Sequence, residues 1–467
     1  MIGIFPKPKL LITTLEKVAI ERELLNLGEF FGTRKWRDVA LQVPEQYAQE
    51  LASTKGSIST LFETVCGFLE LDQEQLRLVF SVDEVEAESG IDLLFSEGST
   101  PAGDSGTMPE DQVEMVLGKN LVFESLLGAM VRKLVAAKLV LSGYVDRSNP
   151  GLWQSAEVAT VFFGFGLFAS HEKPACCDDP SQEISLISRV PLSGFHSFGF
   201  GYLLALVLWT RQQTQLSIAR YLRPDAGYSY RKSLRFLQKT RDSLLVSTHV
   251  SRLESTSSIS TLESWLKSGT PSERVWGLEL ILQREDVPRS VTLIQPTLFQ
   301  LLKYRDRHVV QLALRLIGFA ESLESSEILR LKRLARGSDI WISSVVANIL
   351  SRHLDFCGCE TEFARLVDRF DFVAANNAAQ MAGRFGSQAS KHIPKICYWL
   401  RICVNRCDDQ IGCCYAMMLL GISNDPQAVL EQVFGGDEEL FRGAFQLLEA
   451  ARETVDNQKE NNQGSVV

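Results

Sequence analysis

The chain has 467 residues, of which 45% are hydrophobic and 22% charged, so it can bury a large core without disulfides or a structural metal. Its formal net charge of −9 argues against nucleic acid or an anionic membrane as a global partner, because such binders usually present a basic surface. The first residues lack the apolar segment of a signal peptide. We therefore expect a cytoplasmic protein whose ten cysteines are reduced thiols, buried for the most part as small hydrophobes.

Residues 1–246 predict a mixed α+β domain at the start of a mainly α chain. Apolar periodicity predicts helices at 15–31 and 60–71, and short apolar runs predict strands at 39–43 and 76–82. The composition then shifts toward Glu, Asp, Gly, Ser and Pro. Such a run has too few apolar residues to pack, which predicts a flexible loop at 83–110 despite one apolar island at 91–95. Further helices are predicted at 120–141, 155–168, 200–211 and 228–245.

Two apolar runs, 158–169 and 195–210, raise the question of a membrane segment. Each is shorter than the roughly 18–20 apolar residues that a helix needs to span a bilayer. We therefore expect buried core helices and no membrane span. The alternative is a membrane-associated protein anchored by these Phe-rich helices.

A string of Phe and Gly at 160–168 is followed by GYLLAL at 201–206 and YLRPD at 221–225. These segments resemble a group of bacterial zincin-like metallopeptidase domains. In that family an upstream helix carries HExxH, whose two histidines hold zinc while the glutamate polarises the attacking water. The resemblance implies that the helix at 120–141 is the motif helix. The other interpretation of the Phe-Gly string is a tightly packed core helix whose glycines admit a close neighbour.

The motif positions implied by this resemblance fall on Arg132, Lys133 and Ala136, none of which is a zinc ligand. Glu157 stands where a third ligand would lie, but one carboxylate cannot make a site. The resemblance therefore implies a degenerate domain that keeps the fold without metal, cofactor or catalytic residue. The alternative is a metal-dependent hydrolase with non-standard ligands, such as Glu157 with His171 or His196.

The predicted helix at 228–245 is basic, and tyrosines interleave with its cations. This pattern is compatible with a patch that faces RNA or phosphate. A solvated helix face is the commoner origin of such a pattern, and the acidic chain as a whole favours it. Nucleic acid is therefore not the partner that we expect from the sequence.

A Ser/Thr-rich linker at 247–260 precedes an internal repeat at 261–454. A small residue followed by apolar residues three or four positions later recurs six times, at spacings of about 28 to 38 residues. Helix-start signals lie at Thr270, where a capping box is formed with Glu273, and at Asp306, Ser338 and Asp408. The six small residues, which we expect to pack against neighbouring helices, are Gly277, Ala313, Ala347, Ala378, Ala416 and Ala444.

This periodic region resembles the HEAT-repeat family of α-solenoids and predicts about six helix pairs. The cysteines clustered between 357 and 414 fit no metal-ligand spacing and are expected to pack inside the repeats. The polar tail at 455–467 predicts disorder. The sequence thus favours a non-catalytic scaffold that binds a protein partner through its solenoid, without establishing the absence of enzymatic activity.

Overall fold

The computed structural model describes residues 10–32, 58–73, 76–81, 93–95, 113–118, 123–169, 197–214, 216–246 and 257–464. The chain divides into two compact units. Unit 1 comprises 1–253 with 269–276, and unit 2 comprises 254–268 with 277–467. The first division lies inside the predicted linker at 247–260. A second division passes through helix α12 (Pro271–Leu282), whose first turns belong to unit 1.

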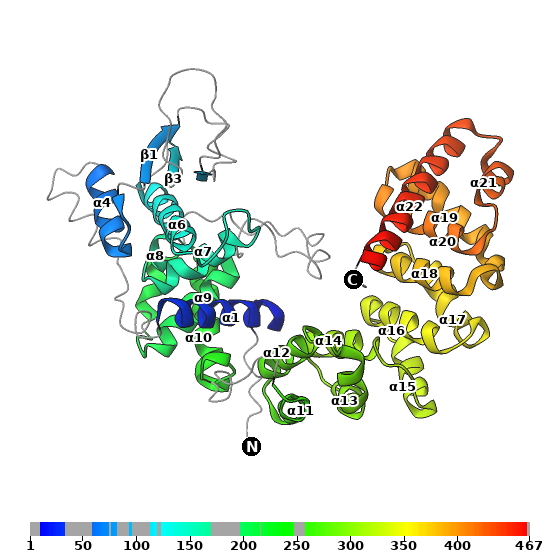
Figure 1. The fold of residues 1–467 in the computed structure, drawn as a ribbon, viewed down its shortest axis with the longest axis horizontal. Coiled ribbons are helices and arrows are strands. Elements are labelled where there is room, and N and C mark those ends of the chain that lie inside the picture. Colours follow the sequence, from blue (N-terminus) through cyan, green and yellow to red (C-terminus); the bar gives the residue numbers. More distant parts are fainter. Residues whose placement is uncertain are drawn as a thin grey trace. The chain divides into compact units, whose positions relative to one another are not determined.

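Unit 1 contains a small sheet of three strands in the order β1-β3-β2 (Figure 1). Strand β1 (Leu76–Ser81) pairs in parallel with β3 (Val113–Gly118), and β2 (Leu93–Phe95) pairs with β3 in the antiparallel sense. The prediction of a loop at 83–110 is wrong at residues 93–95, which form β2. The strand predicted at 39–43 lies outside the described residues, and the α+β class of this half stays a prediction.

The other regular elements in the described part of unit 1 are helices. Helix α1 begins at a reciprocal capping box between Thr13 and Glu16, which satisfies two backbone N–H groups at the helix start. The helices are α1 (Thr14–Phe31), α4 (Ile58–Leu69), α6 (Phe123–Leu141), α7 (Leu152–Phe162), α8 (Gly166–Ala169), α9 (Ser197–Thr210) and α10 (Pro224–Thr240), with short 3₁₀ turns η3 (Leu216–Tyr221) and η4 (Leu244–Val246).

The helix predicted at 155–168 is two helices, because the chain turns at Gly164. This glycine has a φ of +91°, a left-handed conformation that side chains disfavour. Its N–H donates to the Val161 carbonyl at 3.1 Å, and the Phe165 N–H donates to the Thr160 carbonyl at 2.9 Å. This is a Schellman motif, which satisfies the last carbonyls of α7. The Phe-Gly string therefore forms the end of α7, the turn and the start of α8, and its aromatic side chains are buried in the core of unit 1.

Helix α9 lies at the centre of the core of unit 1, and its residues from Tyr202 to Leu208 are buried on every side. It packs closely against α10 at Gly201. A Cβ atom on Gly201 would lie 2.5 Å from the Ala226 carbonyl oxygen and 2.9 Å from the Tyr230 nitrogen. No helix in the described part of the chain is both long and apolar enough to cross a membrane.

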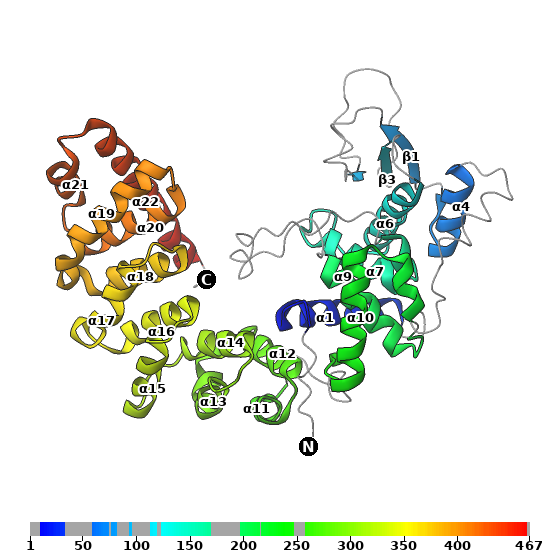
Figure 2. The same cartoon turned by 180° about the vertical axis from the view of Figure 1, so that it is seen from behind.

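Unit 2 is entirely helical where it is described, and its helices stack in chain order (Figures 1 and 2). Each even-numbered helix from α14 to α22 contacts the odd-numbered helix before it, and α14, α16, α18, α20 and α22 contact one another in sequence. The helices are α11 (Ile259–Ser268), α13 (Val287–Leu301), α14 (Arg307–Ile317), α15 (Ser325–Ala335), α16 (Ile340–His353), α17 (Phe356–Val367), α18 (Phe372–Phe385), α19 (Ile393–Arg406), α20 (Asp409–Ile422), α21 (Pro426–Phe434) and α22 (Glu438–Gly464), with a 3₁₀ segment η6 (Gly386–His392).

The six small residues of the repeat occupy one even-numbered helix each, from α12 to α22, and all are buried. Further close approaches are made by glycines. A Cβ atom on Gly421 in α20 would lie 2.8 Å from the Gly383 nitrogen in α18, so these helices meet at backbone distance. The pattern places the small residues where helices of successive pairs pack together.

Aspartates start most of these helices. The Asp306 side chain accepts from the N–H groups of His308 and Val309, and Asp408 accepts from Ile411. The N-cap expected at Ser338 is wrong by one residue, because Asp339 accepts from the Ile342 N–H. The ionised carboxylate of Asp339 is the stronger acceptor and also complements the positive end of the helix dipole.

The tail differs from its prediction. Helix α22 continues to Gly464, so most of the segment 455–467 is helical rather than disordered. Ala444, Leu448 and Ala451 anchor the first part of this helix in the core. Once this nucleus exists, adding polar residues with good helix propensity requires no further nucleation.

The imidazole of His392 gives unit 2 a pH-dependent stability. It packs edge-on against the rings of Phe356 and Phe363, with centroids 6.1 and 5.1 Å away. Burial lowers its pKa below the ordinary 6.5, and Lys391 lowers it further, while Glu360 and Asp368 oppose this shift. The unfolded chain therefore binds a proton more readily than the folded chain.

We expect the free energy of unfolding of unit 2 to be highest above pH 6.5 and to fall as the pH drops below it, because the half-buried neutral imidazole of His392 must then gain a charge. Denaturant midpoints of the full chain at pH 7.0 and 5.5 measure this loss. In His392→Gln the loss should shrink to the share of His353, whose pKa burial also lowers. An unchanged pH dependence in this variant would contradict the assignment.

Candidate binding sites

The four positions that the zincin resemblance implies as motif positions lie in packed helices. Arg132, Lys133 and Ala136 are buried on α6, and Glu157 is buried on the adjoining α7. The Arg132 guanidinium lies over the Trp153 ring at 5.3 Å, and both cations and the carboxylate have interaction partners. They are thus placed as buried structural groups. Among the described residues no three His, Cys, Asp or Glu side chains converge as metal ligands, while His171 and His196 lie outside them.

The cysteines of unit 2, all of which the structure describes, are free thiols. Cys359, Cys397, Cys403 and Cys414 are buried, and burial raises the pKa of each thiol to about 11 or 12. They are therefore protonated at neutral pH and are poor metal ligands and nucleophiles. The expectation of buried cysteines does not extend to Cys357 and Cys407, which are exposed.

A buried ionic network in unit 1 was not predicted. The Lys17 ammonium is 1% exposed and lies 3.2 Å from a Glu21 oxygen and 3.6 Å from an Asp242 oxygen. It also donates to the Ser272 hydroxyl, at the start of α12. The three contacts match the three protons of the ammonium group. The sequence shows that Lys17 and Glu21 are one helical turn apart. It does not show the partners Asp242 and Ser272, which lie 225 and 255 residues beyond Lys17.

Glu21 is the centre of this network. It is completely buried, and it accepts hydrogen bonds from the Tyr202 hydroxyl and from the Leu244 backbone N–H, the latter at 2.8 Å. Burial and the Glu21 charge raise the pKa of Tyr202 far above its ordinary value, so the phenol keeps its proton and donates. Through Leu244 and Asp242 the network fixes the path of the chain after α10.

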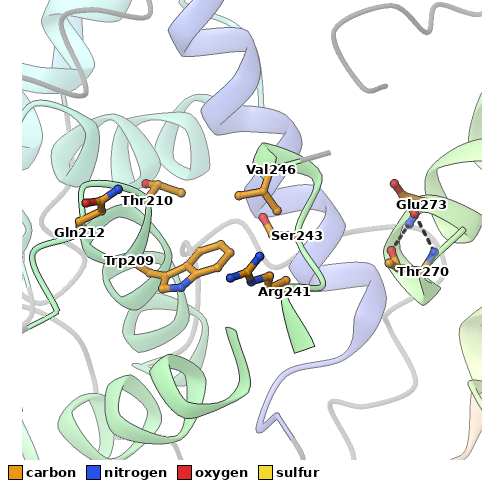
Figure 3. A pocket seen from close by; sticks show the side chains of 8 residues that line it. All are labelled: Trp209, Thr210, Gln212, Arg241, Ser243, Val246, Thr270 and Glu273. Atoms are coloured by element: carbon orange, nitrogen blue, oxygen red, sulfur yellow. Dashed lines mark hydrogen bonds between the residues drawn. The ribbon is translucent and has the colours of Figure 1, made fainter. Parts of the chain in front are cut away.

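That segment forms one wall of a pocket of about 500 Å³ (Figure 3). Trp209, Thr210 and Gln212 come from the end of α9, and Thr270 and Glu273 come from the start of α12. Two pocket residues, Gln212 and Arg241, have φ values of +60° and +50°. Glycine is the usual residue in this conformation at helix ends, so both positions carry a side chain against a backbone preference. The segment after α10 contributes Arg241, Ser243 and Val246.

A row of cations leads along α10 toward this pocket. Residues 220–241 hold seven Arg or Lys residues and a single carboxylate, Asp225, in a chain of net charge −9. Tyr228 is 46% exposed, and the Lys232 ammonium lies 4.6 Å from the centre of its ring. The opposite side of α10 is buried in unit 1. The basic helix predicted at 228–245 starts earlier and ends at Thr240, where Arg241 caps it.

Arginines join successive helices of unit 2. Arg352 of α16 donates to the Gly318 carbonyl at the end of α14, at 2.6 Å. Arg384 of α18 donates to the Asn348 carbonyl and to the Ser351 hydroxyl of α16. The Arg352 guanidinium satisfies a carbonyl that the end of α14 leaves unpaired and complements the negative end of its dipole, whereas Arg384 links the last turn of α18 to the C-terminal part of α16. These contacts were not predicted, although an arginine in the last turn of α16 and of α18 is a signal that the sequence contains.

These arginines belong to a surface that we name the even-helix face. Helices α14, α16 and α18 contain four arginines and no Asp or Glu, and the aspartates that precede them are occupied as N-caps. The Asn348 amide donates to the Gln380 side-chain oxygen at 2.7 Å, which links α16 to α18. The even-helix face is defined by Arg315, Asn348, Arg352, Gln380 and Arg384, all of them partly or fully exposed.

No protein-family model, no curated protein and no solved structure matches this chain. The resemblances to HEAT repeats and to zincin-like domains therefore stay predictions. The sites described above rest on their own geometry.

Proposed function

We propose that this chain is a non-catalytic interaction protein that binds an acidic protein segment on the even-helix face of a HEAT-like solenoid. The observation that carries the proposal is the charge of α14, α16 and α18, which present arginines and no carboxylate. Arginine clusters recognise acidic and phosphorylated peptides through bidentate hydrogen bonds. The hydrogen bonds that join α16 to α18 hold this surface in one arrangement, which reduces the ordering cost of binding.

Within the described ranges, which leave out His171 and His196, no group of metal-ligand side chains supports the alternative of a metal-dependent hydrolase. Its one described carboxylate, Glu157, is buried on α7, a helix that packs against α6, where Arg132 and Lys133 are buried. Elemental analysis of the purified full chain remains its test. Stoichiometric zinc that is lost in Glu157→Ala would restore the hydrolase hypothesis.

Two single charge reversals, one on an even-numbered helix and one on an odd-numbered helix, test the proposed function. Arg315 is exposed on α14, and Arg333 is exposed on α15. We expect Arg315→Glu to weaken capture of protein partners by the full chain about tenfold, because it places like charges together, whereas Arg333→Glu should leave capture unchanged. Quantitative mass spectrometry of affinity purifications measures both. Equal capture by wild type and Arg315→Glu, or equal loss in both variants, would overturn the proposal.

A further inference from the structure

The exposed side of α10 is a continuous cationic stripe. Tyr228, the adjacent pair Arg231 and Lys232, Arg235 and Lys239 follow one another at intervals of three or four residues, which places them on one face of the helix. At 1.5 Å of rise per residue the stripe is about 17 Å long. Apart from Tyr228, this face lacks the apolar side chains that a membrane-binding helix would insert, because the apolar side of α10 is buried in the core of unit 1.

The stripe has no internal counter-charge among the described residues. Asp225, the one carboxylate in 220–241, lies 3.9 Å from Arg223 and accepts from the Ala226 N–H at the start of α10. Arg231, Arg235 and Lys239 are exposed and form no ion pair within the described ranges. Such cations are available to an external polyanion, and the acidic charge of the whole chain does not neutralise them locally.

The pocket supplies a second, chemically different element at the end of the same helix. Trp209 offers an indole surface, Arg241 offers a guanidinium, and Thr210, Gln212 and Ser243 offer hydrogen-bonding groups (Figure 3). A volume of about 500 Å³ lies within the usual range for small-ligand sites. An aromatic wall beside a cation suits a planar base attached to a phosphate.

We propose that the α10 stripe and this pocket together bind single-stranded nucleic acid. Lys239, Arg235 and Arg231 contact successive phosphates, while one unpaired base enters the pocket and stacks on Trp209. A duplex keeps its bases paired and cannot fill the pocket in this way. An acidic peptide would satisfy the stripe but leave the indole wall unused. This inference concerns unit 1 and does not depend on the function proposed for the solenoid.

Fluorescence anisotropy of the full chain with fluorescein-labelled 20-nucleotide oligo-U and oligo-dT tests the stripe and separates RNA from DNA. We expect Arg231→Glu/Arg235→Glu/Lys239→Glu to weaken binding at least tenfold. The slope of log affinity against log salt should also fall by about 2, because each lost phosphate contact removes about 0.7 for a single strand. The matched control Lys303→Glu/Arg305→Glu/Arg442→Glu changes the net charge equally on exposed residues of unit 2 and should bind as wild type.

Two further variants test the pocket. Trp209→Ala should weaken binding of both oligonucleotides about tenfold and leave the salt slope unchanged, because stacking involves no phosphate. Arg241→Gly should also weaken binding without lowering the melting temperature, since glycine suits the left-handed backbone at this position. Absence of binding to both oligonucleotides, or equal loss in the matched control, would overturn the proposal. Tighter binding of phosphatidylserine vesicles or of polyglutamate would also overturn it, in favour of a membrane or an acidic protein.

Discussion

Replacement of Lys17 by Met is expected to lower the free energy of unfolding of unit 1 by about 3–5 kcal/mol, because it leaves two buried carboxylates without their cation. Lys17 and Glu21 are 1% and 0% exposed, so water cannot screen or solvate the charges that remain. The Ser272 hydroxyl also loses its donor. Chemical denaturation followed by tryptophan fluorescence measures the loss, and hydrogen exchange in α1 assigns it to unit 1.

The ion pair of Arg442 and Glu438 provides a matched control. It has the same i,i+4 spacing as the Lys17–Glu21 pair, but its side chains are 67% and 87% exposed. Arg442→Met should therefore cost less than about 0.5 kcal/mol. Asp242→Asn added to Lys17→Met should recover part of the stability, because it removes one of the two uncompensated charges. If Lys17→Met cost no more than Arg442→Met, the network would not stabilise unit 1 as described.

The second large effect is expected at Gly201, where α9 and α10 meet. In Gly201→Ala the new methyl group would lie 2.5 Å from the Ala226 carbonyl oxygen and 2.7 Å from the Ser229 Cβ atom. Backbone cannot move aside as a flexible side chain can, so the helices must separate. We expect a loss of about 2–3 kcal/mol in the free energy of unfolding, even though alanine is the better helix former.

Gly67→Ala is the control for helix propensity. Gly67 is exposed in α4, and a Cβ atom there would meet nothing within 4 Å. This variant should gain up to about 1 kcal/mol, measured by the same denaturation experiment. A gain in both variants would show that the contact between α9 and α10 is looser than the structure has it. Because α9 carries Trp209 and α10 leads to Arg241, Gly201→Ala should also disturb the pocket between their ends.

The buried network and the pocket are physically connected. Asp242 and Leu244 engage Lys17 and Glu21, and Arg241 and Ser243 next to them in sequence line the pocket. Because Asp242 and Leu244 hold this segment on its buried side, its backbone has little conformational freedom on the side that faces the pocket. The network can therefore keep the Arg241 side chain in position despite its left-handed backbone.

Local patterns in the sequence determined most of the secondary structure. Apolar periodicity located α1 and α6, because the side that faces a core repeats every 3.6 residues whatever the partner, whereas α9 was located by a continuous apolar run. Small residues located the even-numbered helices of unit 2, because close packing needs a missing side chain at a fixed place. The capping box at Thr270 is likewise a local interaction.

Tertiary structure alone decided the features that join distant residues. The sequence could not show that Lys17 meets Asp242 and Ser272, because a buried lysine and an exposed lysine look alike in one sequence. Strand β2 lies where the sequence predicts a loop, since a strand of three residues carries too few side chains to show a period. The charge of the even-helix face emerged only when α14, α16 and α18 were brought side by side. Periodicity reports that a residue is buried, whereas only the fold reports what it is buried against.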